Sequence, residues 1–200
     1  MEITFRKNEI IFNRELSSLD KLAIKFASKL NKLGIKYVIV AGYVAIVFGR
    51  SRSSEDIDVI MEPLDYSRFE KLYRLLSSTF ECHQAPNAKL GFEYLTDNIA
   101  LRFSPPAEFI PNIELKFAKT EIDEFSIAHR IKVTVNSNKI FIAPLEPQIC
   151  YKLYMGSEKD VEDALYLYDI FKKRLNKSYL RNFAKRLGVE KELQRMKWYI

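Results

Sequence analysis

The chain has 200 residues, of which 48% are hydrophobic and 13% aromatic, enough to bury the core of one domain, with or without an appendage. No apolar run reaches the roughly 20 residues of a membrane-spanning helix, and the start MEITFRKNEI lacks the apolar segment of a signal peptide. We therefore expect a cytoplasmic protein with no membrane partner. Cys82 and Cys150 form no CxxC pattern and lie near no paired histidines, which argues against a disulfide framework or a zinc site.

The formal net charge of +6 is concentrated at the end of the chain. Residues 172–200 hold ten basic side chains and two acidic ones, a net +8, which leaves the remainder slightly acidic. A basic end on a near-neutral body favours a polyanionic partner such as RNA, for example tRNA, or DNA. Basic helices are also often merely solvated, and that alternative stays open.

The first 80 residues alternate between helix and strand patterns. Ser18 can cap a helix whose apolar residues recur at helical spacing up to Leu33, with Gly34 just past its end. Four further segments are then expected: a strand covered on both faces at 36–42, a short helix at 43–49, a strand at 56–61 and an amphipathic helix at 64–80 that starts near Asp65 or Ser67.

From residue 81 to 144 the pattern becomes that of β-structure. Strands are expected in FECHQ, GFEYLTD, IALRFS, NIELKFA, HRIKVTV and KIFIAP, with a hairpin turn at Asn136–Asn138. Helices return in PQICYKLYMG, EKDVEDALYLYDIFKKRL, KSYLRNFAKRLG and VEKELQRMKWYI. We therefore expect an α+β protein with a core at 1–145 and a helical C-terminal region with a basic end at 146–200.

Two aspartates, Asp56 and Asp58, alternate with apolar residues in the sequence DIDV. Because side chains alternate along a strand, both carboxylates should project from one face, roughly 6.6 Å apart along it. Convergent carboxylates at that spacing can share divalent cations such as Mg²⁺, which prefers carboxylate and phosphate oxygens. A solvated strand edge would show the same alternation and is the alternative explanation.

The segment before these aspartates adds groups that suit a triphosphate. A predicted strand, a turn at Gly42 and a short helix precede them, and such a turn brings backbone N–H groups close to a bound phosphate. Arg50 and Arg52 can donate charge-assisted bonds to phosphate oxygens, and Ser54 offers a hydroxyl. Solvation at the surface is the alternative for both arginines.

The stretch VAGYVAIVFGRSRSSEDIDVI resembles the signature of the DNA polymerase β-like nucleotidyltransferase superfamily, a glycine-containing turn followed by Asp-x-Asp between hydrophobic residues. It is closer still to small prokaryotic proteins of the AbiEii toxin type and related nucleotidyltransferase-like proteins. Two motifs carry that likeness: R-x-[ST]-x-D-[IV]-D, matched by Arg52, Ser54, Asp56, Ile57 and Asp58, and a late Lys-Asp-x-x-Asp, matched by Lys159, Asp160 and Asp163 after Lys152 and Leu153. The likeness covers about residues 20–170.

The resemblance implies a mixed sheet flanked by helices, and transfer of a nucleoside monophosphate (NMP) from a nucleoside triphosphate (NTP) to an acceptor hydroxyl. It also implies two Mg²⁺ ions held by Asp56 and Asp58, with a third acidic residue on a neighbouring strand that can help to deprotonate the acceptor. Glu114 in NIELKFA is the candidate for that third catalytic and metal-binding position, and Glu93 in GFEYL is its competitor.

The nucleotide is assigned to Gly42, Tyr43, Arg52, Ser54 and Lys159. By resemblance Lys159 reaches a phosphate, although its i,i+4 spacing to an aspartate is also typical of an exposed, ion-paired helix. Tyr43 stands where the superfamily usually has glycine or serine, so its ring could stack on a base or block the pocket.

Two functions from different classes follow from these residues. The first is a metal-dependent nucleotidyltransferase whose acceptor is an RNA, a partner protein or a small molecule such as an antibiotic. Members of the likeness act as toxins, so a cognate antitoxin is implied by resemblance alone. The second is a non-catalytic module of the same fold that binds nucleic acid or a partner protein. The pair Asp56 and Asp58 favours the enzyme, because like charges that converge without a metal are costly to ionise.

Overall fold

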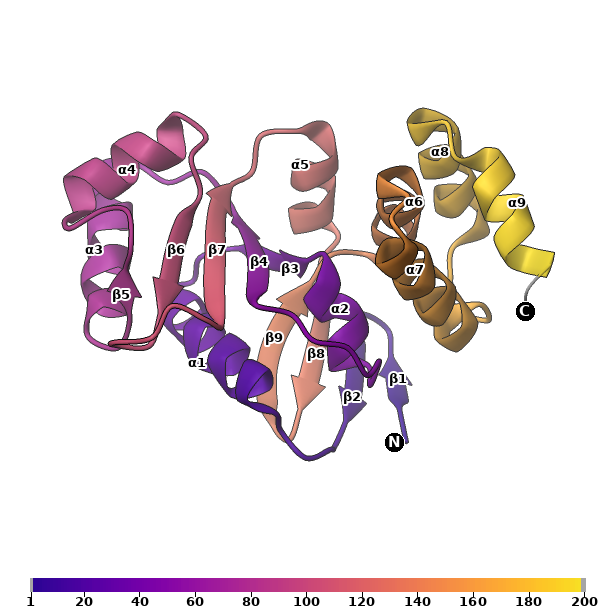
Figure 1. Ribbon diagram of the computed structural model, residues 1–200, viewed down its shortest axis with the longest axis horizontal. Helices are drawn as coiled ribbons and strands as arrows, with labels where there is room; N and C mark the ends of the chain where they lie inside the picture. Colours follow the sequence, from indigo (N-terminus) through magenta and orange to yellow (C-terminus); the bar gives the residue numbers. More distant parts are fainter. Residues whose placement is uncertain (1, 199–200) are drawn as a thin grey trace.

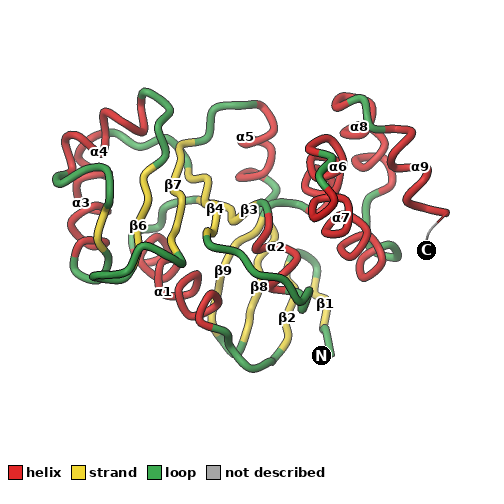
Figure 2. The backbone as a smooth tube through the Cα atoms, in the orientation of Figure 1, coloured by secondary structure: helices red, strands yellow, loops and turns green. Residues whose placement is uncertain are grey.

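The computed structural model describes residues 2–198, in which nine strands form one mixed sheet (Figures 1 and 2). The strands lie in the order β1-β2-β8-β9-β3-β4-β7-β6-β5. Their bounds are β1 Thr4–Arg6, β2 Glu9–Phe12, β3 Tyr37–Val40, β4 Asp56–Met61, β5 Glu81–Cys82, β6 Leu101–Ser104, β7 Asn112–Phe117, β8 Ile131–Val135 and β9 Asn138–Ile142. Strand β4 lies between β3, which is antiparallel to it, and β7, which is parallel to it. The predicted α+β fold with a mixed sheet flanked by helices is confirmed.

Helices cover the two faces of the sheet unequally. Their bounds are α1 Ser18–Lys32, α2 Gly42–Val47, α3 Tyr66–Ser77, α4 Ala88–Thr96, α5 Glu121–Ala128, α6 Leu145–Met155, α7 Glu158–Phe171, α8 Lys177–Leu187 and α9 Glu190–Trp198. Phe26 of α1 and Leu72 of α3 are buried with Ile57 and Val59 of β4 in the main hydrophobic core. On the other face, Ile127 of α5 belongs to a much smaller cluster. That second face is therefore only partly covered.

The C-terminal helices pack as a group beside α2 (Figure 1). Helix α6 contacts α7 and α8, and α7 contacts α2. From Leu145 onward every described element is a helix, as expected, while the division into two domains stays a prediction. The expected last helix is α9, and residues 199–200 of its predicted range lie outside the described part of the chain. Within residues 2–198, no helix combines the length and apolar character that a membrane span requires.

Capping residues set the helix ends. Asp65 caps α3, as predicted, and Gly34 follows α1 with φ 64°, a left-handed conformation that favours glycine. The predicted cap of α1 was wrong by one residue. Ser17, not Ser18, accepts the backbone N–H of Asp20, because Asp20 at the third helical position reaches back and completes a capping box.

The predicted strand at 91–97 is wrong. These residues belong to α4, which begins after Asn87, whose side chain accepts the Leu90 N–H at 3.0 Å. The cap, together with the four-residue spacing of the buried Gly91 and Leu95, outweighs the β-propensity of the aromatic residues between them. Glu93 consequently lies exposed on a helix rather than on a strand beside β4, which removes it as the third acidic residue.

Three elements escaped the sequence patterns, namely β1, β2 and α5. The two strands have three and four residues, too few to establish an alternation. Helix α5 carried a signal, because Thr120 and Asp123 form a capping box at its start. The hairpin turn between β8 and β9 is confirmed, with Asn136 at φ 46° and Ser137 at φ 68°.

Candidate active site

Asp56 and Asp58 lie on one face of β4, as their alternation predicts. The residues between and after them are buried, and the two aspartates occupy the opposite, partly exposed face. In the sheet, Asp58 pairs with Val40 of β3 on one side and with Glu114 of β7 on the other. The strand order therefore brings together the three acidic residues that the sequence singled out.

Glu114 is engaged by two basic side chains. Arg102 of β6 donates to Glu114 Oε1 from Nε at 2.8 Å and from Nη2 at 2.6 Å. Lys116 Nζ lies 3.3 Å from Glu114 Oε2 and 3.6 Å from Asp58 Oδ1. Both oxygens of Glu114 are thus paired within the protein, while Asp58 shares only the more distant contact with Lys116.

These contacts shift the protonation equilibria in opposite directions. Burial raises the pKa of the Asp58 carboxyl; Lys116 opposes the shift, whereas Asp56 and Glu114 add to it. Burial also disfavours the charged Glu114, but the Arg102 hydrogen bonds and the Lys116 charge outweigh it and leave the pKa of Glu114 lowered. Asp58 is accordingly less well neutralised than Glu114.

The turn between β3 and α2 is held by a side chain from α6. Ala41 has φ 58° and ψ −135°, a backbone conformation that residues other than glycine rarely adopt. Gln148 Nε2 donates to the Ala41 carbonyl at 2.9 Å, and Gln148 Oε1 accepts the Ala41 N–H at 3.3 Å. Because Ala41 directly follows Val40, the sheet partner of Asp58, this clamp holds the turn beside the acidic cluster.

A side chain at position 42 would press on Arg52. A Cβ atom at position 42 would lie 3.0 Å from Arg52 Nη2 and 3.2 Å from its Cζ. The guanidinium therefore packs directly on the turn where phosphates were expected. That the backbone of Gly42 contacts a nucleotide stays a prediction, and Arg52 is placed to take part in the same contact.

Gly42→Ala is expected to lower the free energy of unfolding by about 1–2 kcal/mol, because Arg52 has to move and its contact to Asp163 at 2.6 Å resists this. Urea denaturation of the variant and the wild type measures the loss. The same substitution should have little effect in an Arg52→Ala background, where the obstruction is gone. Equal losses in both backgrounds would show that Arg52 is not the reason for the glycine.

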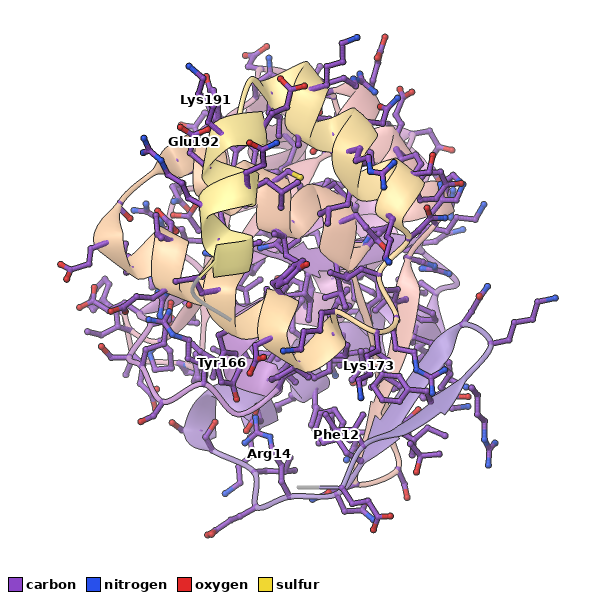
Figure 3. All side chains as sticks on the ribbon, turned by 90° about the vertical axis from the view of Figure 1, so that its right-hand side faces the viewer. Phe12, Arg14, Tyr166, Lys173, Lys191 and Glu192 are labelled. Atoms are coloured by element: carbon purple, nitrogen blue, oxygen red, sulfur yellow. The ribbon has the colours of Figure 1, made fainter. Side chains whose placement is uncertain are left out.

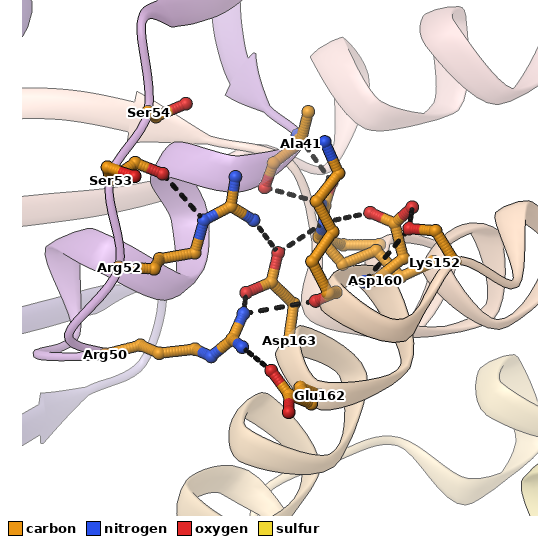
Figure 4. A network of polar contacts seen from close by, with 12 residues as sticks. Ala41, Arg50, Arg52, Ser53, Ser54, Lys152, Asp160, Glu162 and Asp163 are labelled. Carbon is orange, nitrogen blue, oxygen red and sulfur yellow. Dashed lines mark hydrogen bonds and ion pairs between the residues drawn. The ribbon is translucent and has the colours of Figure 1, made fainter.

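Arg50 and Arg52 meet a buried carboxylate of α7, Asp163 (Figure 4). The Asp163 side chain is 0% exposed, and Arg52 Nη1 lies 2.6 Å from its Oδ2 while Arg50 pairs with Oδ1. Lys152 of α6 adds a third cation, with Nζ 2.6 Å from the same Oδ2. The arginines are therefore not merely solvated, and this cluster ties the loop before β4 to α6 and α7.

The two lysines in and before the Lys-Asp-x-x-Asp motif, Lys159 and Lys152, do not lie as expected. Lys159 is exposed, and its backbone carbonyl accepts a hydrogen bond from Arg50 Nη1 at 3.1 Å. Lys152 is the buried lysine, with a side chain 4% exposed and Nζ 3.0 Å from Asp160 Oδ1. Burial lowers the pKa of Lys152, and Asp160 opposes that shift. A phosphate contact by Lys159 stays a prediction.

The prediction that Tyr43 contacts the nucleotide was wrong. Its side chain is 1% exposed, and its hydroxyl donates to Asp20 Oδ1 of α1 at 2.8 Å. At its position in α2, Tyr43 packs into the main core, so the ring neither stacks on a base nor blocks a pocket. Ser54 instead supports the acidic pair, because its Oγ donates to the Asp56 carbonyl at 3.1 Å and to Asp56 Oδ1 at 3.3 Å.

A cavity of about 490 Å³ opens beside Asp58. Its walls come from β3, β4, β7, the end of α4, α5 and α6. The lining is largely apolar and includes Ile60, Ile122 and Tyr151, with Lys116 among its few charged groups. Its size lies within the roughly 300–1,000 Å³ that small-molecule sites occupy.

The sequence and the structure were compared with those of known proteins. No protein-family model matches the chain, and no curated protein matches it. An antigenic nucleotidyltransferase-like protein from Paracoccidioides brasiliensis has a similar structure over 90% of this chain and 93% of its own, with a TM-score of 0.55 and 18% identity. ANT(2″)-Ia in complex with adenylyl-2″-tobramycin is similar over 86% of this chain and 98% of its own, with a TM-score of 0.56 and 11% identity. The chain has a nucleotidyltransferase fold.

The nucleotidyltransferase fold confirms the general resemblance seen in the sequence. The narrower resemblance to the AbiEii toxin type stays a prediction. In this nucleotidyltransferase fold, Asp56 and Asp58 have the chemistry to hold Mg²⁺, because they offer hard oxygen donors and Asp58 lines the cavity. Within residues 2–198, no three side chains of His, Cys, Asp or Glu are grouped to hold a metal ion. The donors therefore fit an ion bound by two carboxylates, whose other ligands are phosphate or water oxygens.

In this nucleotidyltransferase fold, the described basic side chains just after α7 and on α8 and α9 are exposed (Figure 3). The exposed side chains include those of Lys173, Lys177, Arg181, Lys185 and Lys191. Lys172 pairs with Asp169 at 2.8 Å, and Arg186 pairs with Glu121 at 2.7 Å. The exposed group suits a polyanion, and RNA binding stays a prediction.

Proposed function

We propose that this protein is a metal-dependent nucleotidyltransferase that transfers NMP from an NTP to an acceptor hydroxyl. Asp56 and Asp58 hold Mg²⁺, and Glu114 is the third acidic residue of the site. The triphosphate is bound at the same site by Gly42, Arg52 and Ser54, with Lys159 as a further phosphate partner.

One observation carries the proposal, namely the open placement of the acidic pair. Asp56 and Asp58 share the partly covered face of a strand near the middle of the sheet, and Asp58 lines a cavity. Burial and two neighbouring carboxylates raise the pKa of Asp58 against the opposing charge of Lys116, so its ionised form would be favoured by a further bound cation. A divalent ion bound at Asp56 and Asp58 would stabilise their ionised carboxylates.

The reaction forms a bond between the acceptor oxygen and the α-phosphorus, breaks the bond from that phosphorus to the bridging oxygen, and releases pyrophosphate and the hydroxyl proton. A divalent ion, when bound, supplies positive charge to the phosphate oxygens. Gln148 keeps the β3–α2 turn in its strained conformation beside Asp58. Ser54 orients the Asp56 carboxylate, and Arg52 presents a guanidinium at Gly42.

A small molecule is the acceptor class that the cavity supports best. The cavity has the size and largely apolar lining of a small-molecule site, with Asp58 and Lys116 in its wall. The similarity to ANT(2″)-Ia, which was solved with an adenylylated antibiotic, agrees with this class. RNA bound by the exposed basic residues of α8 and α9 is the next candidate, and a toxin role with an antitoxin partner rests on the sequence resemblance alone.

A non-catalytic binding module is the second candidate function. Glu114 is neutralised by Arg102 and Lys116, and Arg52 by Asp163, so part of the expected machinery has partners within the protein. A protein that keeps the fold and lacks the chemistry could use such pairs for stability.

Calorimetric titration of each of the four NTPs with Mg²⁺ separates the two candidates. Wild type should bind at least one NTP in the presence of Mg²⁺ and lose that binding with EDTA. Asp56→Asn should weaken binding on the order of 10–100-fold, because one of two carboxylate ligands is lost. Glu93→Gln is the matched control, since it removes an exposed carboxylate on α4 and should change nothing.

Transfer is then tested with α-³²P-labelled NTPs and two pools of acceptors, small hydroxyl compounds and total tRNA. Label on a small compound supports the proposal and its acceptor class, whereas label on tRNA supports the enzyme and overturns that class. Absence of nucleotide binding would overturn the enzyme and favour the binding module.

A further inference from the structure

Lys116 places an ammonium group between two acidic residues of the site. Lys116 lies on β7 two residues after Glu114, so both side chains project from the same face as Asp58. Its Nζ is 3.6 Å from Asp58 Oδ1 and 3.3 Å from Glu114 Oε2. Lys116 therefore occupies the position at which a cation shared by Asp58 and Glu114 would be expected.

Arg102 completes the neutralisation of Glu114. Nε and Nη2 of Arg102 donate to Glu114 Oε1, and Lys116 pairs with Oε2. Each oxygen of the Glu114 carboxylate therefore has a basic partner. Three acidic and two basic side chains leave the cluster with one net negative charge. A single divalent ion more than neutralises the side chains of this cluster, so a second ion would have to be held by the charge of the triphosphate rather than by these carboxylates.

A two-ion site requires carboxylates that bridge ions about 3.5–4 Å apart. Asp58 lies beside Glu114 across the two strands, and on that side it already contacts the ammonium of Lys116. The two carboxylates on β4 remain available for one ion, which is the usual number of protein carboxylates for Mg²⁺ with substrate phosphates. The geometry thus differs from the two-ion expectation.

We propose that the site takes one divalent cation, at Asp56 and Asp58, and that the ammonium of Lys116 replaces the second cation. Glu114 is then a positioning residue that holds Lys116 and does not itself bind the metal. The positive charge of Lys116 faces the cavity, where it is available to a phosphate or to the acceptor oxygen. This inference rests on the proposed function of the same site.

The test counts Mn²⁺ ions by electron paramagnetic resonance in the presence of α,β-methylene analogues of the four NTPs. Two Mn²⁺ ions about 4 Å apart give a spin-coupled signal that a single ion does not give. Wild type should bind one Mn²⁺ per protein–nucleotide complex without the coupled signal. Lys116→Met, which keeps an apolar stem and removes the charge, should bind two and show the coupled signal.

Lys119→Met is the matched control. Lys119 also lines the cavity, and among residues 2–198 it has no ion-pair partner, so its loss removes the same charge without freeing Asp58 or Glu114. Its ion count should equal that of wild type. A Glu114→Gln variant should also keep one ion, because this glutamate holds Lys116 and not the metal.

The outcomes separate this inference from the proposed function. A coupled two-ion signal in wild type, or an unchanged count in Lys116→Met, would overturn the inference and leave the nucleotidyltransferase proposal standing. No Mn²⁺ bound to wild type with any analogue would overturn both.

Discussion

Replacing Asp58 with asparagine is expected to reduce nucleotidyl transfer at least 100-fold while leaving the protein as stable as wild type, or about 1 kcal/mol more stable. The loss of activity follows from the loss of a metal ligand. The gain in stability follows because burial raises the pKa of Asp58, so the folded state holds an ionised carboxylate at a cost at neutral pH. Lys116 keeps its contact with Glu114 after the substitution.

The pH dependence of this effect has a definite sign. A carboxyl group whose pKa is higher in the folded than in the unfolded state destabilises the fold progressively as pH rises through the interval between the two values. Asp58→Asn should therefore match wild type at low pH and exceed it above that interval. Urea denaturation without divalent ions at pH 4, 5.5 and 7 measures this, with transfer assayed at pH 7. A variant that is inactive and also several kcal/mol less stable would show a structural role for Asp58.

Asp163→Asn is expected to lower the free energy of unfolding by about 3–5 kcal/mol. Asp163 is 0% exposed and pairs with Arg50, Arg52 and Lys152. Removing its charge leaves these cations in a buried setting with fewer partners, and their desolvation is then no longer offset. The loop before β4 should lose its attachment to α7, so nucleotide affinity should fall as well.

Glu162→Gln is the control for this cluster. Glu162 also pairs with Arg50, but its side chain is 57% exposed, so its loss should cost less than about 1 kcal/mol. Urea denaturation of both variants measures the difference. Similar small losses in the two variants would contradict the assignment of Asp163 as the centre of the cluster.

The acidic site was largely readable from the chain. Alternation placed Asp56 and Asp58 on one face of a strand, and the same pattern around Glu114 indicated a second strand, which the family resemblance placed beside the first. The two strands themselves needed only local periodicity, because side chains alternate between the two faces of any strand. Glu93 shows where such reasoning fails, because its aromatic neighbours indicated a strand whereas the Asn87 cap started a helix.

The partners of these residues were not readable in the same way. Gln148 reaches Ala41 across 107 positions, and Arg52 reaches Asp163 across 111, so no local pattern connects them. The burial of Tyr43 depended on the core into which α2 packs and on the hydrogen bond to Asp20 of α1, which a six-residue helix does not specify by itself. Similarly, the pairing of Glu114 with the guanidinium of Arg102 depends on the register of β6 and β7.

Local spacing was enough to predict most of the helices and strands, the paired aspartates and the basic C-terminal end, because periodicity, capping and charge depend on nearby residues, while the nucleotidyltransferase fold was expected from the resemblance of the motifs. The tertiary structure decided which charged side chains form ion pairs with one another. It neutralised Glu114 with Arg102 and Lys116, buried Asp163 among three cations, and left Asp58 beside an open cavity. Those outcomes depend on distances between segments remote in sequence, and electrostatic interactions are set by those distances and by burial rather than by residue type.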